Sequence, residues 1–463
     1  MTNCCLWEGI ICNVDGTVTD ISLVSMGLEG HISPSLGSLT GLLRLNLSGN
    51  SLSGALPPEL LRSSSIVILD VSYNKLDGDF DELPSTPDQA MKVVNISSNL
   101  FTGSFLSTTL EGMKNLAALN MSNNSFTGKI PSTVCVDKPF FVVLDLSYNQ
   151  FHGDIPPELG NCSVLRVLKA GQNQLSGTLP AELFKATSLE HLSFPNNHLQ
   201  GTLDPEHVVK LSKLVILDLG GNGLYGKIPD SIGELKRLEE LHLDYNNMSG
   251  ELPSALGNCS NLTTLILEGN FFHGKLNVSN NSLNGDIPTA LMEMPMLESL
   301  ANSDIGQLKE LLTLNLSFNN LYGKIPQSIG NITNLQVLDL SYNNLTGAIP
   351  STLDKLHFLS ELNVSNNDLE GPVPTGGQFS TFPDSSFVGN PKLCSPMLVH
   401  HCSSADAAPA PNVSTEHYID KVIFAIAFGM FFGVGVLYDQ MVLSRYIYFD
   451  RIIVAIISSY NRL

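Results

Sequence analysis

Basic residues are scarce in this chain of 463 residues. Lys and Arg together number 24, against 44 Asp and Glu, so the formal net charge is −20. A protein that binds DNA or RNA neutralises phosphates with a stripe or patch of basic side chains. The sequence has no such stripe, which argues against a nucleic-acid partner. An acidic composition rich in Asn and Ser is instead typical of a secreted, well-solvated domain.

Motifs that carry catalysis or bind metals are also missing. The sequence has no phosphate-binding loop and no kinase signature, and its histidines are scattered without a recognisable Ser/His/Asp or paired-carboxylate arrangement. Its cysteines include no C-x-x-C pair with histidines at zinc-site spacing. We therefore expect a protein that is not an enzyme and that needs no cofactor or metal.

Leucine recurs with a fixed period along most of the chain. Residues 335–350, LQVLDLSYNNLTGAIP, follow the pattern L-x-x-L-x-L-x-x-N-x-L-x-G-x-I-P, which recurs every 24 or 25 residues from Asn50 to Asn270 and again from Asn319 to Asn367. This period and this spacing of leucines are the signature of leucine-rich repeats, which stack into a solenoid. A chance abundance of leucine would not keep register over so many consecutive units.

The motif predicts how each repeat folds. The leucines of L-x-x-L-x-L point inward and the intervening residues point outward, so that one long parallel β-sheet forms on the concave face. The Asn turns the chain out of the strand, and its amide satisfies backbone groups of neighbouring repeats. The G-x-I-P segment adds a short extended piece before the convex side. The predicted fold class is an α/β solenoid, a leucine-rich-repeat horseshoe or superhelix.

The repeat register fails twice in the C-terminal half. Only 11 residues separate Asn270 from Asn281, too few at about 3.3 Å per residue to circle a repeat, and 38 residues separate Asn281 from Asn319. We interpret both breaks as joins where sequence has been removed. The expected organisation is an N-terminal cap (1–17), regular repeats (18–270), disrupted repeats (271–304), C-terminal repeats (305–374) and a C-terminal cap (375–402).

A long apolar run lies near the C-terminus. Residues 403–420 are rich in Ala, Pro and Ser and are predicted to be a juxtamembrane linker. The uninterrupted apolar run that follows predicts a single membrane helix over 421–444. Arginines are in excess in the tail, 445–463, which places the tail in the cytosol and the repeats outside. Gly429 and Gly433 form G-x-x-x-G, a small-residue face for helix packing that also arises by chance.

Several stretches resemble plant leucine-rich-repeat receptors. The G-x-I-P element is that of the plant-specific repeat class, and residues 5–12, CLWEGIIC, are similar to the N-terminal cap of these receptors. Residues 169–204, 291–297 and 373–394 look like the phytosulfokine and tyrosine-sulfated glycopeptide receptor group, and residues 425–446 are similar to its kinase-less members. The resemblance implies a single-pass type I protein of the plasma membrane. Such a protein recognises an extracellular peptide or microbial ligand and signals through co-receptor and adaptor receptor kinases.

Two departures from that group are visible. The island that helps to bind ligand should follow MPML (residues 294–297), and it is absent. Met1 runs straight into the cap without an apolar segment, so that a signal peptide is missing. We interpret this start as a truncated gene model rather than as the start of a cytosolic protein.

The resemblance also implies disulfides and glycans. It pairs Cys5 with Cys12 and Cys394 with Cys402. Cys135 lies one repeat before Cys162 and can reach it; the alternative is that Cys162 and Cys259 are buried thiols. Glycosylation sequons that should lie away from the concave face occur at Asn161, Asn258, Asn261 and Asn331 and, in the linker, at Asn412.

The candidate ligand-binding residues are those that the motif projects from the strands of the regular middle repeats. They are Lys169, His191, Ser193, Asp218, His242, Asp244 and Tyr245. The leading interpretation is a non-catalytic receptor-like protein. The alternatives are a ligand-sequestering decoy, a wall-protein inhibitor similar to polygalacturonase inhibitors, or a truncated, non-functional relic of a receptor.

Overall fold

The computed structural model describes residues 3–79, 90–105, 113–267, 269–277, 284–286 and 311–394. The chain divides into two units, 1–402 and 403–463, and every described residue belongs to the first. Within the described residues no helix is long and apolar enough to cross a membrane. The predicted linker, membrane helix with Gly429 and Gly433, and tail lie outside them.

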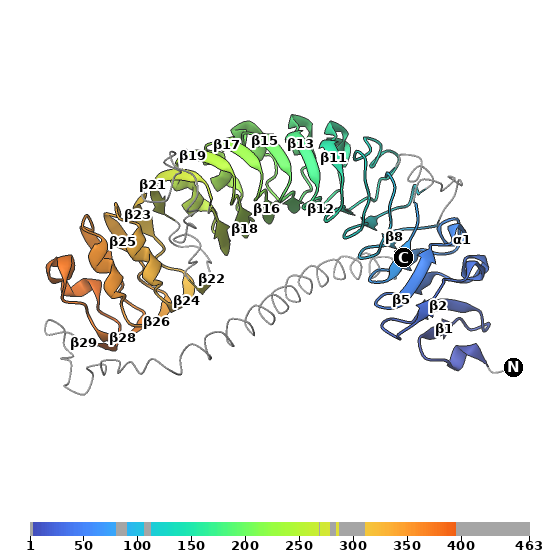
Figure 1. The fold of residues 1–463 in the computed structure, drawn as a ribbon, viewed down its shortest axis with the longest axis horizontal. Helices are drawn as coiled ribbons and strands as arrows, with labels where there is room; N and C mark the ends of the chain where they lie inside the picture. Colours follow the sequence, from blue (N-terminus) through green and yellow to red (C-terminus); the bar gives the residue numbers. More distant parts are fainter. Residues whose placement is uncertain are drawn as a thin grey trace, which may run out of the picture. The chain divides into compact units, whose positions relative to one another are not determined.

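Short strands on the inner side of the curved repeat stack form the first sheet (Figure 1). Most of them are the x-L-x segment of one repeat, with its leucine buried, as in Leu168 and Leu192. The first two strands pair antiparallel, and all later neighbours are parallel and in register. In sheet order the described strands are β1 (Ile10–Cys12), β2 (Val18–Ser22), β4 (Arg44–Asn46), β6 (Ile68–Asp70), β8 (Val93–Asn95), β9 (Ala118–Asn120), β10 (Val143–Asp145), β12 (Val167–Lys169), β14 (His191–Ser193), β16 (Ile216–Asp218), β18 (Glu240–His242) and β20 (Thr264–Ile266).

A second set of parallel strands follows the Asn of the motif, where the sequence predicted a short extended piece. Its strands over the N-terminal and middle repeats are β3 (Glu29–Gly30), β5 (Ser51–Ala55), β7 (Lys75–Asp77), β11 (His152–Asp154), β13 (Gln174–Thr178), β15 (His198–Gly201), β17 (Gly223–Gly226) and β19 (Asn247–Glu251). The motif glycine lies in these strands at positive φ, for example +75° at Gly177. A Cβ there would lie 2.5 Å from an Asp154 carboxylate oxygen, so glycine suits this close approach.

One-turn helices lie on the side opposite the first sheet in most of the repeats that the structure describes in full. Most are 3₁₀ helices, and the proline of G-x-I-P sits at their N-cap because its fixed φ is already suited to a helix start. The described helices of this part are η1 (Cys4–Leu6), η2 (Pro34–Ser38), α1 (Pro58–Leu61), η3 (Pro157–Asn161), η4 (Ala181–Lys185), α3 (Pro205–Val208), η5 (Asp230–Glu234) and η6 (Ser254–Asn258).

The repeats are held together by a continuous core and a ladder of asparagines. Leucines fill the core, and the rings of Phe101, Phe126 and Phe151 stack across three repeats with centroids 6.3 and 6.4 Å apart. Each motif Asn bonds two repeats. Asn74, for example, donates through Nδ2 to the carbonyl oxygens of Leu47, Val71 and Ser72 and accepts at Oδ1 from the Leu52 N–H. The expected role of the amide is confirmed.

The prediction of one long parallel sheet is wrong at the register break. The first sheet ends at β20, and β21 (Phe271–Asn277) joins two layers. Residues 271–273 pair with β19 of the second set, whereas residues 274–277 pair with β23 (Leu311–Asn315), an inner-type strand of the next block. Because 11 residues cannot circle a repeat, the chain runs straight on, so that one strand serves both layers.

The C-terminal block repeats the same design after this crossover. Its inner strands are β23, β25 (Val337–Asp339) and β27 (Glu361–Asn363). Its second sheet contains β22 (Asn284–Asp286), β24 (Asn320–Lys324), β26 (Asn344–Gly347), β28 (Asp368–Pro372) and β29 (Lys392–Cys394). Its helices are η9 (Gln327–Asn331), η10 (Ser351–Lys355) and, in the cap, η11 (Gly377–Thr381) and η12 (Asp384–Ser386).

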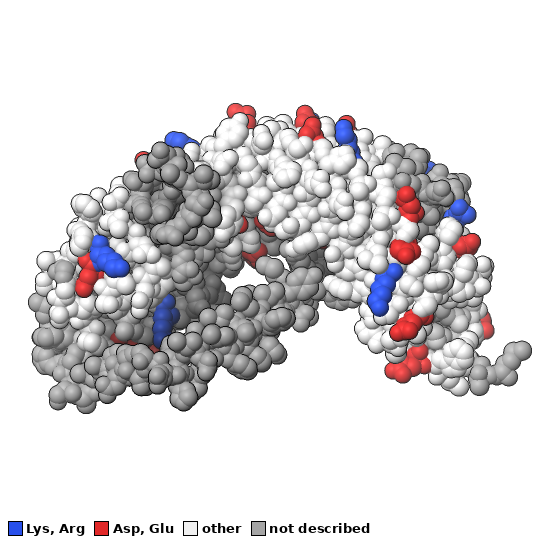
Figure 2. All heavy atoms as spheres, in the orientation of Figure 1, with Lys and Arg blue, Asp and Glu red and all other residues white. Residues whose placement is uncertain are grey.

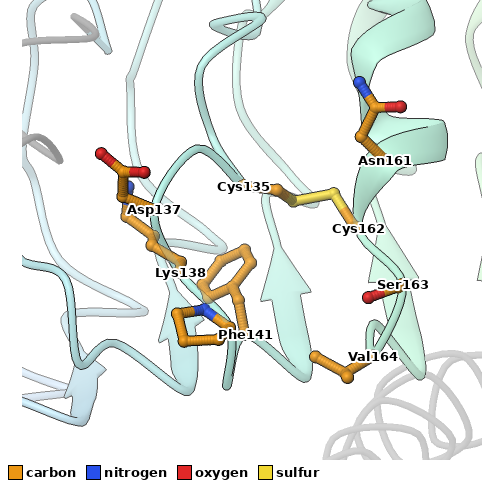
Figure 3. Close-up of a pocket in the computed structure, with 9 residues that line it drawn as sticks. Cys135, Asp137, Lys138, Phe141, Asn161, Cys162, Ser163 and Val164 are labelled. Atoms are coloured by element: carbon orange, nitrogen blue, oxygen red, sulfur yellow. A yellow bond between two sulfur atoms is a disulfide. The ribbon is translucent and has the colours of Figure 1, made fainter.

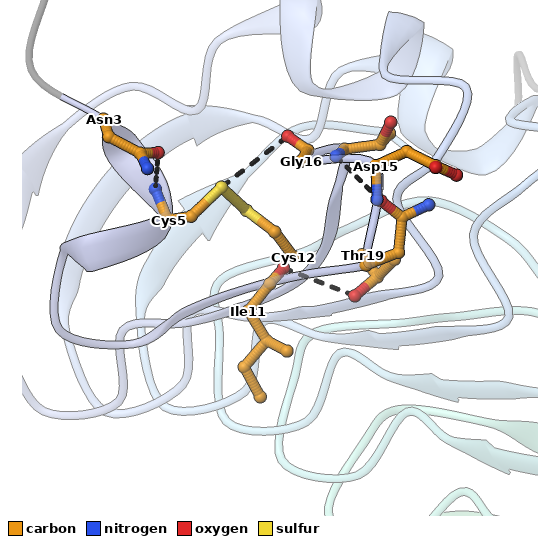
Figure 4. The surroundings of a disulfide bond; sticks show 9 residues. Asn3, Cys5, Ile11, Cys12, Asp15, Gly16 and Thr19 are labelled. Atoms are coloured by element: carbon orange, nitrogen blue, oxygen red, sulfur yellow. Dashed lines mark hydrogen bonds between the residues drawn. A yellow bond between two sulfur atoms is a disulfide. The ribbon is translucent and has the colours of Figure 1, made fainter.

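Disulfides close the N-terminal cap and clamp two middle repeats. Cys5 and Cys12 are bonded beside a turn in which Asn13 Oδ1 accepts from the N–H groups of Asp15 and Thr17 (Figure 4). Cys135 and Cys162, whose pairing the sequence left open, are also bonded, with Cα atoms 5.5 Å apart (Figure 3). Cys394 is disulfide-bonded, and its predicted partner Cys402 lies outside the described residues. Cys4 and Cys259 are free thiols.

Candidate functional site

Four of the seven candidate residues form one row across the inner sheet. Lys169, Ser193, Asp218 and His242 are the last residues of β12, β14, β16 and β18, and each lies directly opposite the next. Neighbouring strands are about 4.8 Å apart, so the row spans about 14 Å. We call these four residues the central row. Figure 2 shows acidic side chains in the hollow beneath this part of the arc.

Hydrogen bonds fix the carboxylate of Asp218 within the central row. The Ser193 hydroxyl donates to Asp218 Oδ2 over 3.1 Å, and the Gly220 N–H donates to Oδ1 over 3.4 Å. His242 Nε2 lies 3.6 Å from a carboxylate oxygen of Glu240, two residues earlier on the same strand. The row therefore presents a cation, a hydroxyl, an oriented carboxylate and an imidazole in sequence, which suits a ligand with both charges.

Asp244 and Tyr245 follow the strand that carries His242. Burial raises the pKa of Asp244, the charge of nearby Asp218 adds to that rise, and a backbone hydrogen bond and His242 oppose it. Tyr245 has a positive φ of 48° and a side chain that is 54% exposed. These two residues extend the central row at one edge, where an exposed ring and a partly buried acid lie next to each other in sequence.

His191 departs from the expectation. It lies on the outward face of β14, but it is only 3% exposed, between Val167 and Ile216 on the neighbouring strands. Desolvation lowers its pKa to about 3, with a smaller contribution from the charges of Lys169 and Arg166. A neutral, covered imidazole is not available to a ligand, because apolar neighbours on both sides close the space around it.

Sequence reasoning missed the structural role of the Asn and Asp residues that end many inner strands. In Asp70, Asp145 and Asp339, as in Asn120 and others, the side-chain Oδ1 accepts the N–H two residues later. These residues shape the turn, and this local pattern is readable as D/N-x-S in the sequence. In the N-terminal repeats the side chains are also buried against each other: Asn95 donates to Asp70 Oδ2 over 3.1 Å. Asp70 and Asn95 are thus less open to a ligand than the polar side chains of the central row.

The glycosylation sequons lie away from the inner sheet. Asn161, Asn258 and Asn331 are the last residues of η3, η6 and η9, and Asn261 lies in the turn after η6. All four are exposed. Asn412 lies outside the described residues. Glycans at the four described positions would leave the central row open.

No group of three or more His, Cys, Asp and Glu side chains in the described ranges is arranged to hold a metal ion. The polar groups of the central row come from separate repeats, and a short ion pair beside it, Arg166 Nη2 to Glu190 Oε2 at 2.6 Å, neutralises two of the neighbouring charges. The arrangement offers directional contacts for a ligand.

Comparisons with known proteins agree with this architecture. Family models described as leucine-rich repeat match residues 307–369, 41–62, 115–136, 141–162, 213–235 and 237–259. The matched segments lie in the N-terminal, middle and C-terminal repeats, and the asparagine ladder runs through them.

The matching segments are similar to those of plant receptor kinases. The chain is 38% identical to phytosulfokine receptor 1 of Arabidopsis thaliana over 79 residues, 17% of this chain and 8% of that protein. It is 46% identical to receptor protein kinase WSS1 of Oryza sativa subsp. japonica over 57 residues, 12% of this chain and 6% of that protein. The matches thus span less than a tenth of the length of these relatives.

A solved structure that is similar to part of this chain is the ectodomain of the Arabidopsis receptor kinase HAESA in complex with an N-terminally extended IDA peptide hormone ligand. It is 28% identical, with 81% of this chain and 66% of that chain covered and a TM-score of 0.47.

Proposed function

We propose that this chain is a non-catalytic receptor-like protein of the plant cell surface that binds an extended extracellular peptide across the central row. The observation that carries the proposal is the in-register alignment of Lys169, Ser193, Asp218 and His242 on one open sheet face. The likeness of several repeats to plant receptor kinases supports the same reading.

The chemistry of the row defines what the peptide would present. The ammonium of Lys169 would bind a carboxylate, and the oriented Asp218 carboxylate would accept from a hydroxyl, an amide or a cation. Tyr245 would add apolar contact at the edge of the row. A peptide with acidic and hydroxyl-bearing residues about 10–15 Å apart matches this order, given the strand spacing.

Signalling in this proposal depends on other proteins. A co-receptor kinase would contact the C-terminal repeats, and an adaptor kinase would pack against the membrane helix through Gly429 and Gly433. The crossover at β21 favours a second candidate, a ligand-sequestering decoy, because the inner sheet that carries the central row ends at β20. Ligand-dependent association with a co-receptor kinase separates the two candidates: a receptor gains it and a decoy does not.

The test is capture of peptides from the extracellular fluid of plant cells by the full chain, with mass-spectrometric identification. A double variant, Lys169→Glu with Asp218→Arg, reverses both charges of the central row. The control is Lys185→Glu, an exposed residue at the end of η4 on the opposite side of the repeats. We expect a captured peptide whose binding falls by at least about tenfold in the double variant and is unchanged in the control. Equal capture by all three proteins would contradict the proposal.

A further inference from the structure

A cavity of about 440 Å³ lies where the inner strands of the C-terminal block meet the C-terminal cap. Its floor is formed by β25 and β27, with Asn315 of β23 at one side, and its wall is the cap segment 381–386. The cavity lies outside the central row, on a different sheet, and neither the repeat motif nor the relatives assign it a role.

The floor of this cavity is acidic, and among the described residues that line it there is no Lys, Arg or His. Asp339 and Glu361 line it from adjacent strands. Oδ1 of Asp339 accepts hydrogen bonds from the N–H and the hydroxyl of Ser341, at 3.0 and 2.7 Å. Its Oδ2 can therefore accept from another donor. The basic residues of 311–394 are Lys324, Lys355 and Lys392. None of them is on β23, β25 or β27, and Lys392 is paired with Asp368 at 2.9 Å.

Ser386 adds a hydroxyl on the opposite wall. It lines the cavity and is only 5% exposed, and its side chain makes no hydrogen bond within the described residues. A hydroxyl that faces a cavity and has no protein partner is normally satisfied by water or by a ligand. The cavity therefore combines two carboxylates and an unused hydroxyl, an acceptor set spread over two walls.

We propose that this cavity binds a guanidinium group, the side chain of an arginine in the peptide ligand. A guanidinium is planar, always charged and carries five donors in a fixed fork, so it can reach acceptors on both walls at once. An ammonium is a compact point charge and would satisfy fewer of them. The inference rests on the proposed function, because it assigns the arginine to the peptide.

The repeats of β23 and β25, which contribute Asn315 and Asp339 to the cavity, offer a contact for the rest of a peptide. Phe318 and Tyr342 follow the strands of Asn315 and Asp339, and their rings stack with centroids 4.2 Å apart. Each ring is 48% exposed. An exposed aromatic pair on the repeats that form the cavity suits an apolar side chain next to the arginine. This favours a peptide over a free small cation as the occupant.

The test uses short probes and the full chain in detergent micelles. Acetyl-Gly-Arg-Gly-amide is compared with the same peptide carrying citrulline, which keeps the size of arginine but has no charge, and with a lysine version. Binding is followed by saturation-transfer NMR and titration. We expect the arginine probe to bind at least about tenfold more tightly than either of the other two.

Variants locate the site. Asp339→Asn and Glu361→Gln should each weaken the arginine probe at least about fivefold, since each removes one carboxylate. Asp339→Asn is compatible with the fold, because Asn315 and Asn363 make the same turn bond at equivalent positions. The matched control is Asp145→Asn, whose Oδ1 also accepts at 3.0 Å from the second following residue but which lies outside the cavity.

The outcomes separate this inference from the proposed function. Equal binding of the arginine and citrulline probes, equal binding of the lysine probe, or unchanged binding by both cavity variants would overturn the guanidinium site. If central-row variants abolish capture of a peptide while the cavity variants do not affect it, the proposed function stands and this inference fails. Selective probe binding that needs Asp339 and Glu361 supports the inference even where no peptide is captured.

Discussion

Removing one rung of the asparagine ladder should destabilise the middle repeats strongly. Asn173 is buried, donates through Nδ2 to the carbonyl oxygens of Leu146, Ala170 and Gly171 at 3.0–3.1 Å, and accepts from the Phe151 N–H at 2.9 Å. The Asn173→Ala variant loses all four bonds at once. The motif asparagines of the neighbouring repeats, such as Asn149 and Asn197, make the same set of bonds.

The loss of stability in Asn173→Ala depends on which hydrogen bonds each of these backbone groups keeps. The three carbonyl oxygens retain another donor: Asn149 Nδ2 on Leu146, Asn197 Nδ2 on Ala170 and the Tyr148 N–H on Gly171. The Phe151 N–H has no replacement, and leaving it unpaired costs about 1–3 kcal/mol. With a few tenths to about 0.5 kcal/mol for each weakened carbonyl, the total is about 2–4 kcal/mol.

Two measurements test this estimate. Urea unfolding gives the loss of stability, and hydrogen exchange gives the protection of the Phe151 amide, because a solenoid opens locally. The control is Gln174→Ala, an exposed neighbour expected to change stability by less than about 0.5 kcal/mol. Asn173→Asp should be at least as harmful as Asn173→Ala, since it turns a carboxylate oxygen toward three carbonyls. If Asn173→Ala behaved like Gln174→Ala, the ladder would not stabilise the repeats and the reasoning would be refuted.

Two further perturbations follow from buried groups. The lowered pKa of His191, about 3 against an ordinary value near 6.5, means that its contribution to stability is present above pH 6.5 and is lost as the pH falls toward 3. In urea unfolding at several pH values, a His191→Gln variant should lower the slope of the unfolding free energy against pH by up to about 1.4 kcal/mol per pH unit. The control His198→Gln, at an exposed site, should keep the slope of the unchanged protein. Equal slopes for all three proteins would argue against a neutral buried His191. Replacing Cys135 and Cys162 by Ser should lower the free energy of unfolding by about 3 kcal/mol. Dithiothreitol should destabilise the middle repeats of the unchanged protein and have no such effect on this double variant, as measured by peptide-resolved hydrogen exchange with and without reductant. The control Cys259→Ser removes a free thiol in the same G-N-C-S context and should keep the effect of dithiothreitol. If the double variant also kept this effect, the Cys135–Cys162 disulfide would not be what stabilises the middle repeats.

The sequence predicted the repeat, its phase and the role of the motif Asn because these depend on local pattern. Inward leucines, the turn at Asn and the proline before each one-turn helix are all specified within one repeat. The phase also placed Lys169, Ser193, Asp218 and His242 on one face, and the structure aligns them in one row.

Features that depend on neighbouring repeats could not be read in this way. His191 shares its strand position with Val143 and Val167, which are buried, and with Glu240, which is partly exposed, so that its burial depends on the neighbouring strands. The 11-residue break was visible in the sequence, but the strand pairing at the break was not. β21 pairs with both β19 and β23, and this pairing depends on which strands lie beside it. The cavity above Asp339 and Glu361 is formed together with the cap segment 381–386, which comes from a different part of the chain than the inner strands.

The central claim is that a peptide lies across the middle repeats of the inner sheet. The most direct test places a photo-crosslinking amino acid at Ser193, in the central row, and separately at Thr187, an exposed position in the turn after η4. Each full-length protein is irradiated with the captured extracellular peptides, and the adducts are mapped by mass spectrometry. The account predicts peptide adducts at position 193 and none at 187. Equal labelling at both positions, or labelling at 187 alone, would contradict it.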